Sequence, residues 1–216
     1  MTTAAGPSPR GLTLDTIVDA ALELIREKGF GALSMRRLAD RCGVGAMTLY
    51  GYVRTKDELL GLIADDLLAA VELPVSPDTP WEETVRCVFR SVRRIFLDHP
   101  ELADVVARQH LNSVAAYRGA EVVLGAVRRA GLSDAQAVSA FVSLTAFTTG
   151  LAQREAHATE RSAQQAQRLM AIHSLPADEF RNVVELGPLM VVGESERHFE
   201  DGLDLMIRGI AAQGAA

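Results

Sequence analysis

The stretch from Ser34 to Lys56 constrains the fold of this chain more than any other. It reads as two short helices around a tight turn. Ser34 is a good N-cap for the first helix, and Gly43 can take the left-handed conformation that ends it. The second helix, expected at about 45–53, buries Leu49 and leaves most of its other side chains exposed. This layout predicts a helix-turn-helix whose second helix enters the DNA major groove.

The charge of this stretch supports the same reading. It contains one acid, Asp40, and five bases: Arg36, Arg37, Arg41, Arg54 and Lys56. The whole chain carries a formal net charge of −6, so a locally basic surface stands out and suits contact with phosphates. Composition and spacing alone also allow a solvated helical hairpin in a protein that never meets DNA.

The composition favours an all-α protein. Of 216 residues 48% are apolar, which is ample for a core, and only 5% are aromatic, with alanine and leucine dominant. No run of 18 apolar residues occurs, so we expect no membrane span. Residues 1–11 are small and polar and lack a signal-peptide core, so we expect a disordered arm there.

Metal and cofactor sites are not expected. Cys42 and Cys87 lie far apart and have no Cys-x-x-Cys partner, which argues against a zinc site or a disulfide framework and favours a reducing cytoplasm. The five histidines, none of which belongs to a helical metal-binding pair, are His99, His110, His157, His173 and His198.

Capping signals divide the chain into two domains. Thr13 caps an apolar stripe over 14–28, and Thr55 opens a capping box for a helix over 56–71. Residues 74–80 form a linker, and Thr79 begins a second capping box for the helix that starts near Trp81. We therefore expect an N-terminal domain over 12–73, which contains the predicted helix-turn-helix, and a C-terminal domain over 79–216; the family resemblance described below implies DNA binding for the first and effector binding and dimerisation for the second.

Two later helices carry heptad seams. The helix over 133–157 has apolar or small residues at Ala137, Phe141, Leu144, Thr148 and Leu151, and the last helix, over 195–212, has Phe199, Leu203, Met206 and Ile210. Between them, 160–173 is a loosely packed helix or a mobile loop, and a short helix over 178–186 is expected to break at Gly187. No segment has the alternation of a strand.

At this point the chain resembles the TetR family of bacterial transcriptional repressors. The resemblance rests on ALSMRRLA at 32–39, GVGAMTLY at 43–50 and KDELL at 56–60, and the C-terminal part is similar to the tetracycline-repressor branch through Trp81, GLS at 131–133 and FEDGLD at 199–204. It implies a cytoplasmic homodimer that binds inverted half-sites of a double-stranded DNA operator and releases them when a small molecule binds. The DNA-binding residues that it implies are Ser34, Arg36, Gly45, Ala46, Met47, Thr48, Tyr50, Tyr52 and Lys56.

Two departures from that branch affect specificity. The recognition helix begins with Gly45, Ala46 and Met47, which can offer only apolar contact, for instance to a thymine methyl group, so the operator should differ. Val88, Val92 and Val106 stand where the tetracycline repressor would place polar and metal-binding side chains. A magnesium–tetracycline ligand is therefore not expected, and a more apolar effector is favoured.

The seams and stripes also predict the other sites. The effector pocket is expected at Val85, Val88, Phe89, Val92, Val106, His110, Tyr117, Leu124, Phe147 and Leu151, with His110 and Tyr117 as polar anchors. The dimer interface is expected at Phe141, Leu144, Thr148, Phe199, Leu203, Met206 and Ile210, although these seams could instead face the core of one subunit.

Two rival functions remain at the sequence level. An enzyme has little support, because the chain has no Gly-x-Ser-x-Gly motif and no phosphate-cradling glycine loop. A helical interaction protein that keeps the dimer scaffold but has lost DNA binding is the other alternative, suggested by the weakly polar start of the recognition helix.

Overall fold

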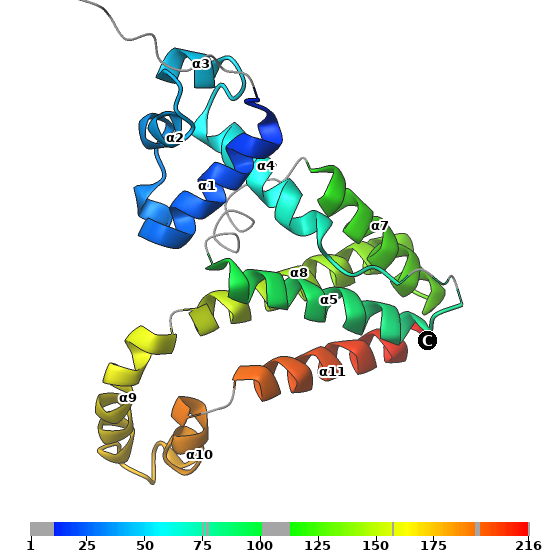
Figure 1. Ribbon diagram of the computed structural model, residues 1–216. Helices are drawn as coiled ribbons and strands as arrows, with labels where there is room; N and C mark the ends of the chain where they lie inside the picture. The colour runs from blue at the N-terminus through cyan, green and yellow to red at the C-terminus, as the bar shows by residue number, and fades with distance from the viewer. Residues whose placement is uncertain are drawn as a thin grey trace, which may run out of the picture. The chain divides into compact units, whose positions relative to one another are not determined.

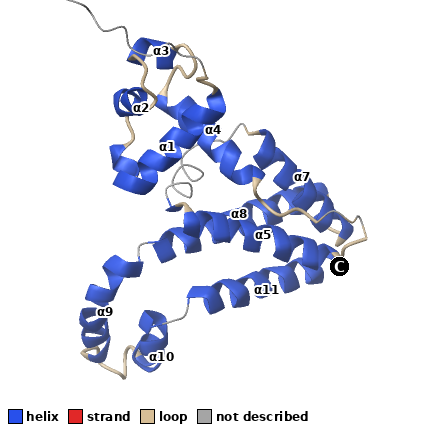
Figure 2. Cartoon of the chain, viewed as in Figure 1, coloured by secondary structure: helices blue, strands red, loops and turns tan. Residues whose placement is uncertain are grey.

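The computed structural model describes residues 11–74, 76, 78–100, 113–156, 158–192 and 195–215, and these are helical with no strand (Figure 2). The chain divides into two compact units: unit 1 holds residues 1–71 and 108–118, and unit 2 holds residues 72–107 and 119–216. Apart from Gly11, the expected N-terminal arm lies outside the described residues.

Unit 1 contains the helices that the capping signals predict. They are α1 (Leu14–Lys28), η1 (Phe30–Ala32), α2 (Met35–Arg41), α3 (Ala46–Tyr50) and α4 (Lys56–Ala69). The side chains of Thr13, Ser34 and Thr55 each accept a backbone N–H bond at the start of α1, α2 and α4. The recognition helix α3 is shorter than predicted, because the chain turns after Tyr50.

The core of unit 1 joins one apolar face from each helix. Its fully buried side chains include Ile17 and Ala21 of α1, Leu38 of α2, Leu49 of α3 and Leu59 of α4. Since every helix contributes to the same core, α2 and α3 are held in a fixed arrangement.

Unit 2 is built from longer helices (Figure 1). They are α5 (Trp81–Asp98), α8 (Asp134–Ala156), α9 (Ala158–His173), α10 (Arg181–Val192) and α11 (Ser195–Gly214), and α7 (Val114–Arg129) belongs to unit 2 from Gly119 onward. The helices α5, α8 and α11 pack against one another, and α9 packs on α10.

The helix α8 is, within the described part of the chain, the one helix long and apolar enough to cross a membrane by length and composition. It packs against α5 and α11 in unit 2.

The predicted dimer seams form the core of one subunit. Leu144 and Thr148 of α8 and Phe199 and Leu203 of α11 are fully buried within the chain itself, and Ile210 is nearly so. These side chains face the core of one subunit, which is the alternative that the sequence left open, because the seams of α8 and α11 pack with α5. Of the remaining predicted interface residues, Phe141 and Met206 are half-buried.

Two boundary predictions are also wrong. Thr79 does not cap α5, which has Pro80 at its N-cap and no side-chain cap. The helix α10 does not break at Gly187 but runs through Pro188. A Cβ on Gly187 would lie 2.5 Å from Ile172 of α9. The glycine at this position therefore allows α10 to pack closely against α9, and this packing supports α10 as one continuous helix. The segment 160–173, left open between helix and loop, lies in the helix α9.

Candidate nucleic-acid interface and effector region

The turn between α2 and α3 has the geometry of a helix-turn-helix. Gly43 has φ of 67°, the left-handed conformation that lets the chain leave α2, and the Val44 N–H then donates to the Ala39 carbonyl at 3.0 Å. Ala39 is buried and small, so α3 crosses closely, and Leu49 anchors α3 in the core with no exposed surface. The opposite side of α3 is left open to solvent.

All nine residues predicted to touch DNA lie exposed on unit 1. They are Ser34, Arg36, Gly45, Ala46, Met47, Thr48, Tyr50, Tyr52 and Lys56. Most of them lie in α3 or directly beside it in the sequence. Leu49 and Val53, which are both fully buried, fix this short segment to the core. The aromatic rings of Tyr50 and Tyr52 are only about half covered, being 43% and 39% exposed.

The bases of this segment divide into two groups. The guanidinium of Arg41 donates to Glu27 through both terminal nitrogens at 2.7 Å and to Glu23 at 2.9 Å, so it ties α2 to α1. This contact lowers the pKa of Glu27, chiefly through the hydrogen bond from Arg41. Within the described residues, the other four bases, Arg36, Arg37, Arg54 and Lys56, pair with no carboxylate, and Arg37 donates to the Ala32 carbonyl at 3.2 Å. Charges such as those of Arg36 and Lys56 are therefore available to phosphates, whereas Arg41 holds the fold.

The helix α4 presents Lys56 at its first turn. Thr55 accepts from the Glu58 N–H at 3.0 Å, and the Glu58 carboxylate accepts from the Arg54 N–H at 2.7 Å. The second half of the predicted capping box is thus shifted by one residue, because Glu58 bonds to Arg54 rather than to the N-cap. The Lys56 ammonium lies 5.3 Å from the centroid of the Phe30 ring, which steadies it without neutralising its charge.

The predicted effector residues fall mainly in unit 2. Val85, Val88 and Phe89 of α5 are buried, and the half-buried members are Val92, Leu124, Phe147 and Leu151. Tyr117, expected as a polar anchor, is 60% exposed and belongs to unit 1. Val106 and His110 lie outside the described residues.

A buried ion pair in unit 2 was not predicted. Arg93 of α5 donates to both carboxylate oxygens of Glu155 at 2.9 and 3.1 Å, with only 15% and 10% of the two side chains exposed. The guanidinium also lies 5.0 Å from the centroid of the Phe199 ring. The sequence held a signal for it, because Glu155 continues the apolar heptad seam of α8 by four residues after Leu151.

The interior of unit 2 also holds polar atoms without hydrogen-bond partners. Among the described residues, Arg93 Nε and the hydroxyl groups of Thr148 and Thr149 are buried and make no hydrogen bond. Phe147 stacks on Phe199 with ring centroids 5.8 Å apart. The interior of unit 2 thus combines apolar walls with a few unsatisfied polar groups.

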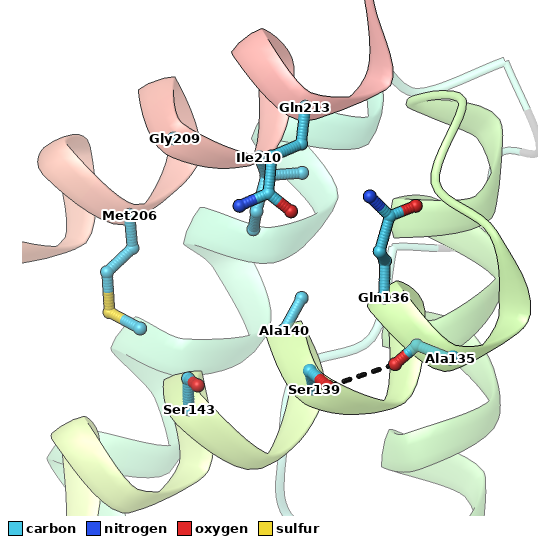
Figure 3. A pocket seen from close by; sticks show the side chains of 9 residues that line it. All are labelled: Ala135, Gln136, Ser139, Ala140, Ser143, Met206, Gly209, Ile210 and Gln213. Carbon is cyan, nitrogen blue, oxygen red and sulfur yellow. Dashed lines mark hydrogen bonds between the residues drawn. The ribbon is translucent and has the colours of Figure 1, made fainter. Parts of the chain in front are cut away.

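Two hollows are described on unit 2. One of about 450 Å³ lies between α8 and α11, and Figure 3 shows its lining of mostly small side chains, Ala135, Gln136, Ser139, Ala140, Ser143, Met206, Gly209, Ile210 and Gln213. The other, of about 590 Å³, lies between α5 and α11 and is lined mainly by charged groups, including Arg90, Arg93 and Glu200. Neither contains a predicted effector residue, whereas the first includes Met206 and Ile210 of the predicted dimer interface.

Comparison with known proteins agrees with this geometry. Residues 17–63 match the family "Bacterial regulatory proteins, tetR family", and residues 73–214 match "Tetracyclin repressor-like, C-terminal domain". An HTH-type transcriptional regulator of Saccharopolyspora erythraea is 32% identical over 93% of this chain and 85% of its own length. The tetracycline repressor protein class D of Escherichia coli is 30% identical over 94% of this chain and 90% of its own length.

Solved structures show the same fold. The structure of apo ActR from Streptomyces coelicolor superposes with a TM-score of 0.88 at 34% identity and covers 97% of this chain and 98% of its own. ActR has also been solved in complex with actinorhodin and with (S)-DNPA. Two family matches over most of the chain, full-length relatives and this superposition confirm the resemblance, the all-α fold and a regulatory rather than an enzymatic role. The chain belongs to the TetR family of transcriptional regulators.

Proposed function

We propose that this regulator is a repressor that binds a palindromic operator as a homodimer and is released by a small, mainly apolar effector bound in unit 2. The exposed face of α3 carries the proposal, because α3 has no acid of its own and belongs to a helix-turn-helix whose described part also exposes cations that pair with no carboxylate, among them Arg36 of α2 and Lys56 of α4.

On the operator, the residues of unit 1 take distinct roles. Lys56 and Arg36 contact phosphates and set the register, whereas Met47, Thr48 and Tyr50 face base edges in the major groove. Ser34 and Gly45 start α2 and α3 and bring backbone N–H groups to the same surface. Ala46 and Tyr52 extend the contact on either side of these residues.

The homodimer pairs α8 and α11 of one subunit with those of its partner. Because the seams are buried, the proposed interface is the other face of these helices. Its exposed apolar side chains are Val138, Val142 and Leu205. The hollow lined by small residues lies between the same two helices (Figure 3). Small side chains such as Ala140 and Gly209 let helices from a partner approach closely.

The effector contacts apolar side chains of α5, α7 and α8. Val92, Leu124, Phe147 and Leu151 keep accessible surface in an otherwise packed unit, which suits an apolar ligand. Arg93, Thr148 and Thr149 supply buried polar groups nearby in the same helices. ActR, a relative over its whole length, binds actinorhodin and (S)-DNPA, so similar compounds are sensible first probes.

Selection from random double-stranded DNA followed by gel shift tests the proposal. The expected result is an inverted repeat with half-sites about 34–36 Å apart, bound with one dimer and steeply weakened by salt. Lys56→Ala should weaken all complexes, while Lys28→Ala, which changes an exposed lysine of α1, serves as the control. Failure to enrich any sequence would instead favour the alternative of a helical interaction protein without DNA binding.

A further inference from the structure

Met47 is the most exposed large apolar side chain in the described part of the chain. It is 84% exposed, more than Met170, Leu189 or Leu205. Nothing within unit 1 packs on it, although the same helix is anchored firmly by Leu49. A flexible, polarizable side chain held out on a rigid element is suited to contact with another molecule.

The geometry of α3 fixes the direction of Met47. Leu49 points into the core, and residues two positions apart in a helix lie about 200° apart around its axis. Met47 therefore points away from the core, on the face opposite Leu49. The backbone N–H groups of Thr48 and Leu49 both donate to the Gly45 carbonyl, at 2.9 and 3.2 Å, so the first turn that carries Met47 is formed.

The first turn of α3 lacks the polar groups that usually read bases. Gly45, Ala46 and Met47 supply no side-chain donor or acceptor, and Thr48 is the first residue that does. In the major groove, the apolar feature that distinguishes one base pair from another is the C5-methyl group of thymine. A methionine at the exposed tip can bury that methyl group but cannot bond to adenine or guanine edges.

We infer that Met47 determines part of the operator sequence by packing on a thymine methyl group, so that each half-site carries an A·T pair at one defined position. This inference rests on the proposed function and adds the chemical group that is read. Losing one buried methyl group should weaken binding about fourfold, which corresponds to ~0.8 kcal/mol. Because the dimer reads two half-sites, removing the methyl group from both half-sites should weaken binding by about the square of that factor.

Uracil substitution in the selected operator tests the inference. Each thymine of the half-site is replaced in turn by deoxyuridine, which pairs identically but lacks the methyl group, and affinities are measured for the wild-type protein and for Met47→Ala. The expected result is one position where the wild type loses about fourfold per half-site and where Met47→Ala loses less than about 1.5-fold. Met170→Ala, which shortens another exposed methionine in unit 2, should keep the full sensitivity.

The outcomes separate this inference from the proposed function. If no DNA is selected, both fail. If a specific operator is selected but the uracil scan of the wild type is flat, the protein is a DNA-binding regulator and the inference is overturned. An unchanged sensitivity in Met47→Ala would also overturn it, because another residue would then read the methyl group. Since Met47 is exposed, unchanged thermal melting of Met47→Ala will show that the comparison concerns recognition and not folding.

Discussion

The carboxylate of Asp65 in α4 accepts hydrogen bonds from the Ser113 hydroxyl at 2.6 Å and from the Ala115 N–H at 2.9 Å. The Ser113 oxygen in turn accepts from the Ala116 N–H at 3.0 Å, so two side chains together cap the start of α7. These groups belong to unit 1, and the same helix continues into unit 2 from Gly119. A negative charge at the N-terminus of a helix is also favourable to its dipole.

Loss of this cap should destabilise α7. We expect Asp65→Ala to lower the free energy of unfolding by about 1–2 kcal/mol, because two donors at the helix start lose their acceptor. Asp65→Asn, which keeps one acceptor oxygen, should cost less. Asp66→Ala changes the exposed neighbour of Asp65 and serves as the control. Urea denaturation of the three variants measures the effect, and equal stability of Asp65→Ala and Asp66→Ala would contradict it.

The sequence predicted the elements whose signals are local. Thr13, Ser34 and Thr55 cap helices at the predicted positions. Each of these side chains bonds within the first turn of its own helix. Two other local signals, at Thr79 and Gly187, did not set a helix boundary, so a local signal predicts an element only where the surrounding structure agrees with it. The exposed surface around α3 was also predicted from a local pattern, because burial of Leu49 determines which other side chains of α3 face the solvent.

The failures concern packing between distant segments. A heptad seam shows that α8 and α11 pack on something, but not whether it lies in the same chain or in a partner. Leu144 and Leu203 pack within the chain because α5 supplies a third apolar face. The periodicity of apolar residues within a single helix does not reveal that such a face is available. The cap from Asp65 and the partner of Arg93 lie 48 and 62 residues away in sequence. The heptad register of Glu155 indicates that its side chain faces inward, but no local pattern identifies the distant residue with which it pairs.

Lys56 should contribute to affinity through phosphate alone. Lys56→Ala is expected to weaken binding to all sequences about equally and to reduce the slope of log affinity against log salt by about 1. The Lys56 ammonium makes a cation–π contact with the Phe30 ring, which an arginine can also make, so Lys56→Arg should keep most of the DNA affinity. Fluorescence anisotropy at several salt concentrations measures both quantities. A changed sequence preference in Lys56→Ala would show that the lysine reads bases.

The dimer should depend on the exposed face of α8 and α11. Leu205 is 64% exposed and Val142 is 56% exposed, so arginine at either position should leave the subunit folded and separate the dimer in sedimentation experiments. Leu14→Arg, at an exposed apolar residue of α1, is the control and should remain dimeric. Leu203→Arg should unfold unit 2 instead, since it places an unpaired charge where no surface is exposed. An intact dimer in Leu205→Arg and Val142→Arg would exclude this face.

Among the predicted effector residues, those that only pack the core should contribute more to folding stability than those that contact the ligand. Phe89 is 3% exposed, and Phe89→Ala should cost about 3–5 kcal/mol of folding stability because it leaves a cavity. Leu151 is only half-buried, so Leu151→Ala should cost clearly less. Guanidinium denaturation of both variants makes the comparison. Equal costs would assign Leu151 to the packed core and remove it from the proposed wall.

The Arg93–Glu155 pair should be costly to break but not costly to replace. Removing the carboxylate in Glu155→Gln leaves the buried guanidinium without its counter-charge, and we expect a loss of about 3–5 kcal/mol. The double variant Arg93→Met with Glu155→Leu removes both charges and also the unsatisfied Nε of Arg93, so it should recover most of that stability or exceed the wild type. Thermal unfolding of Arg93→Met, Glu155→Leu and the double variant gives the coupling energy. The exposed pair of Arg181 and Glu185 in α10 supplies the matched comparison, where Glu185→Gln should cost under about 1 kcal/mol. Additive losses in the double variant would show that the two side chains stabilise unit 2 separately, through their packing on neighbours such as Phe199, and not as an ion pair.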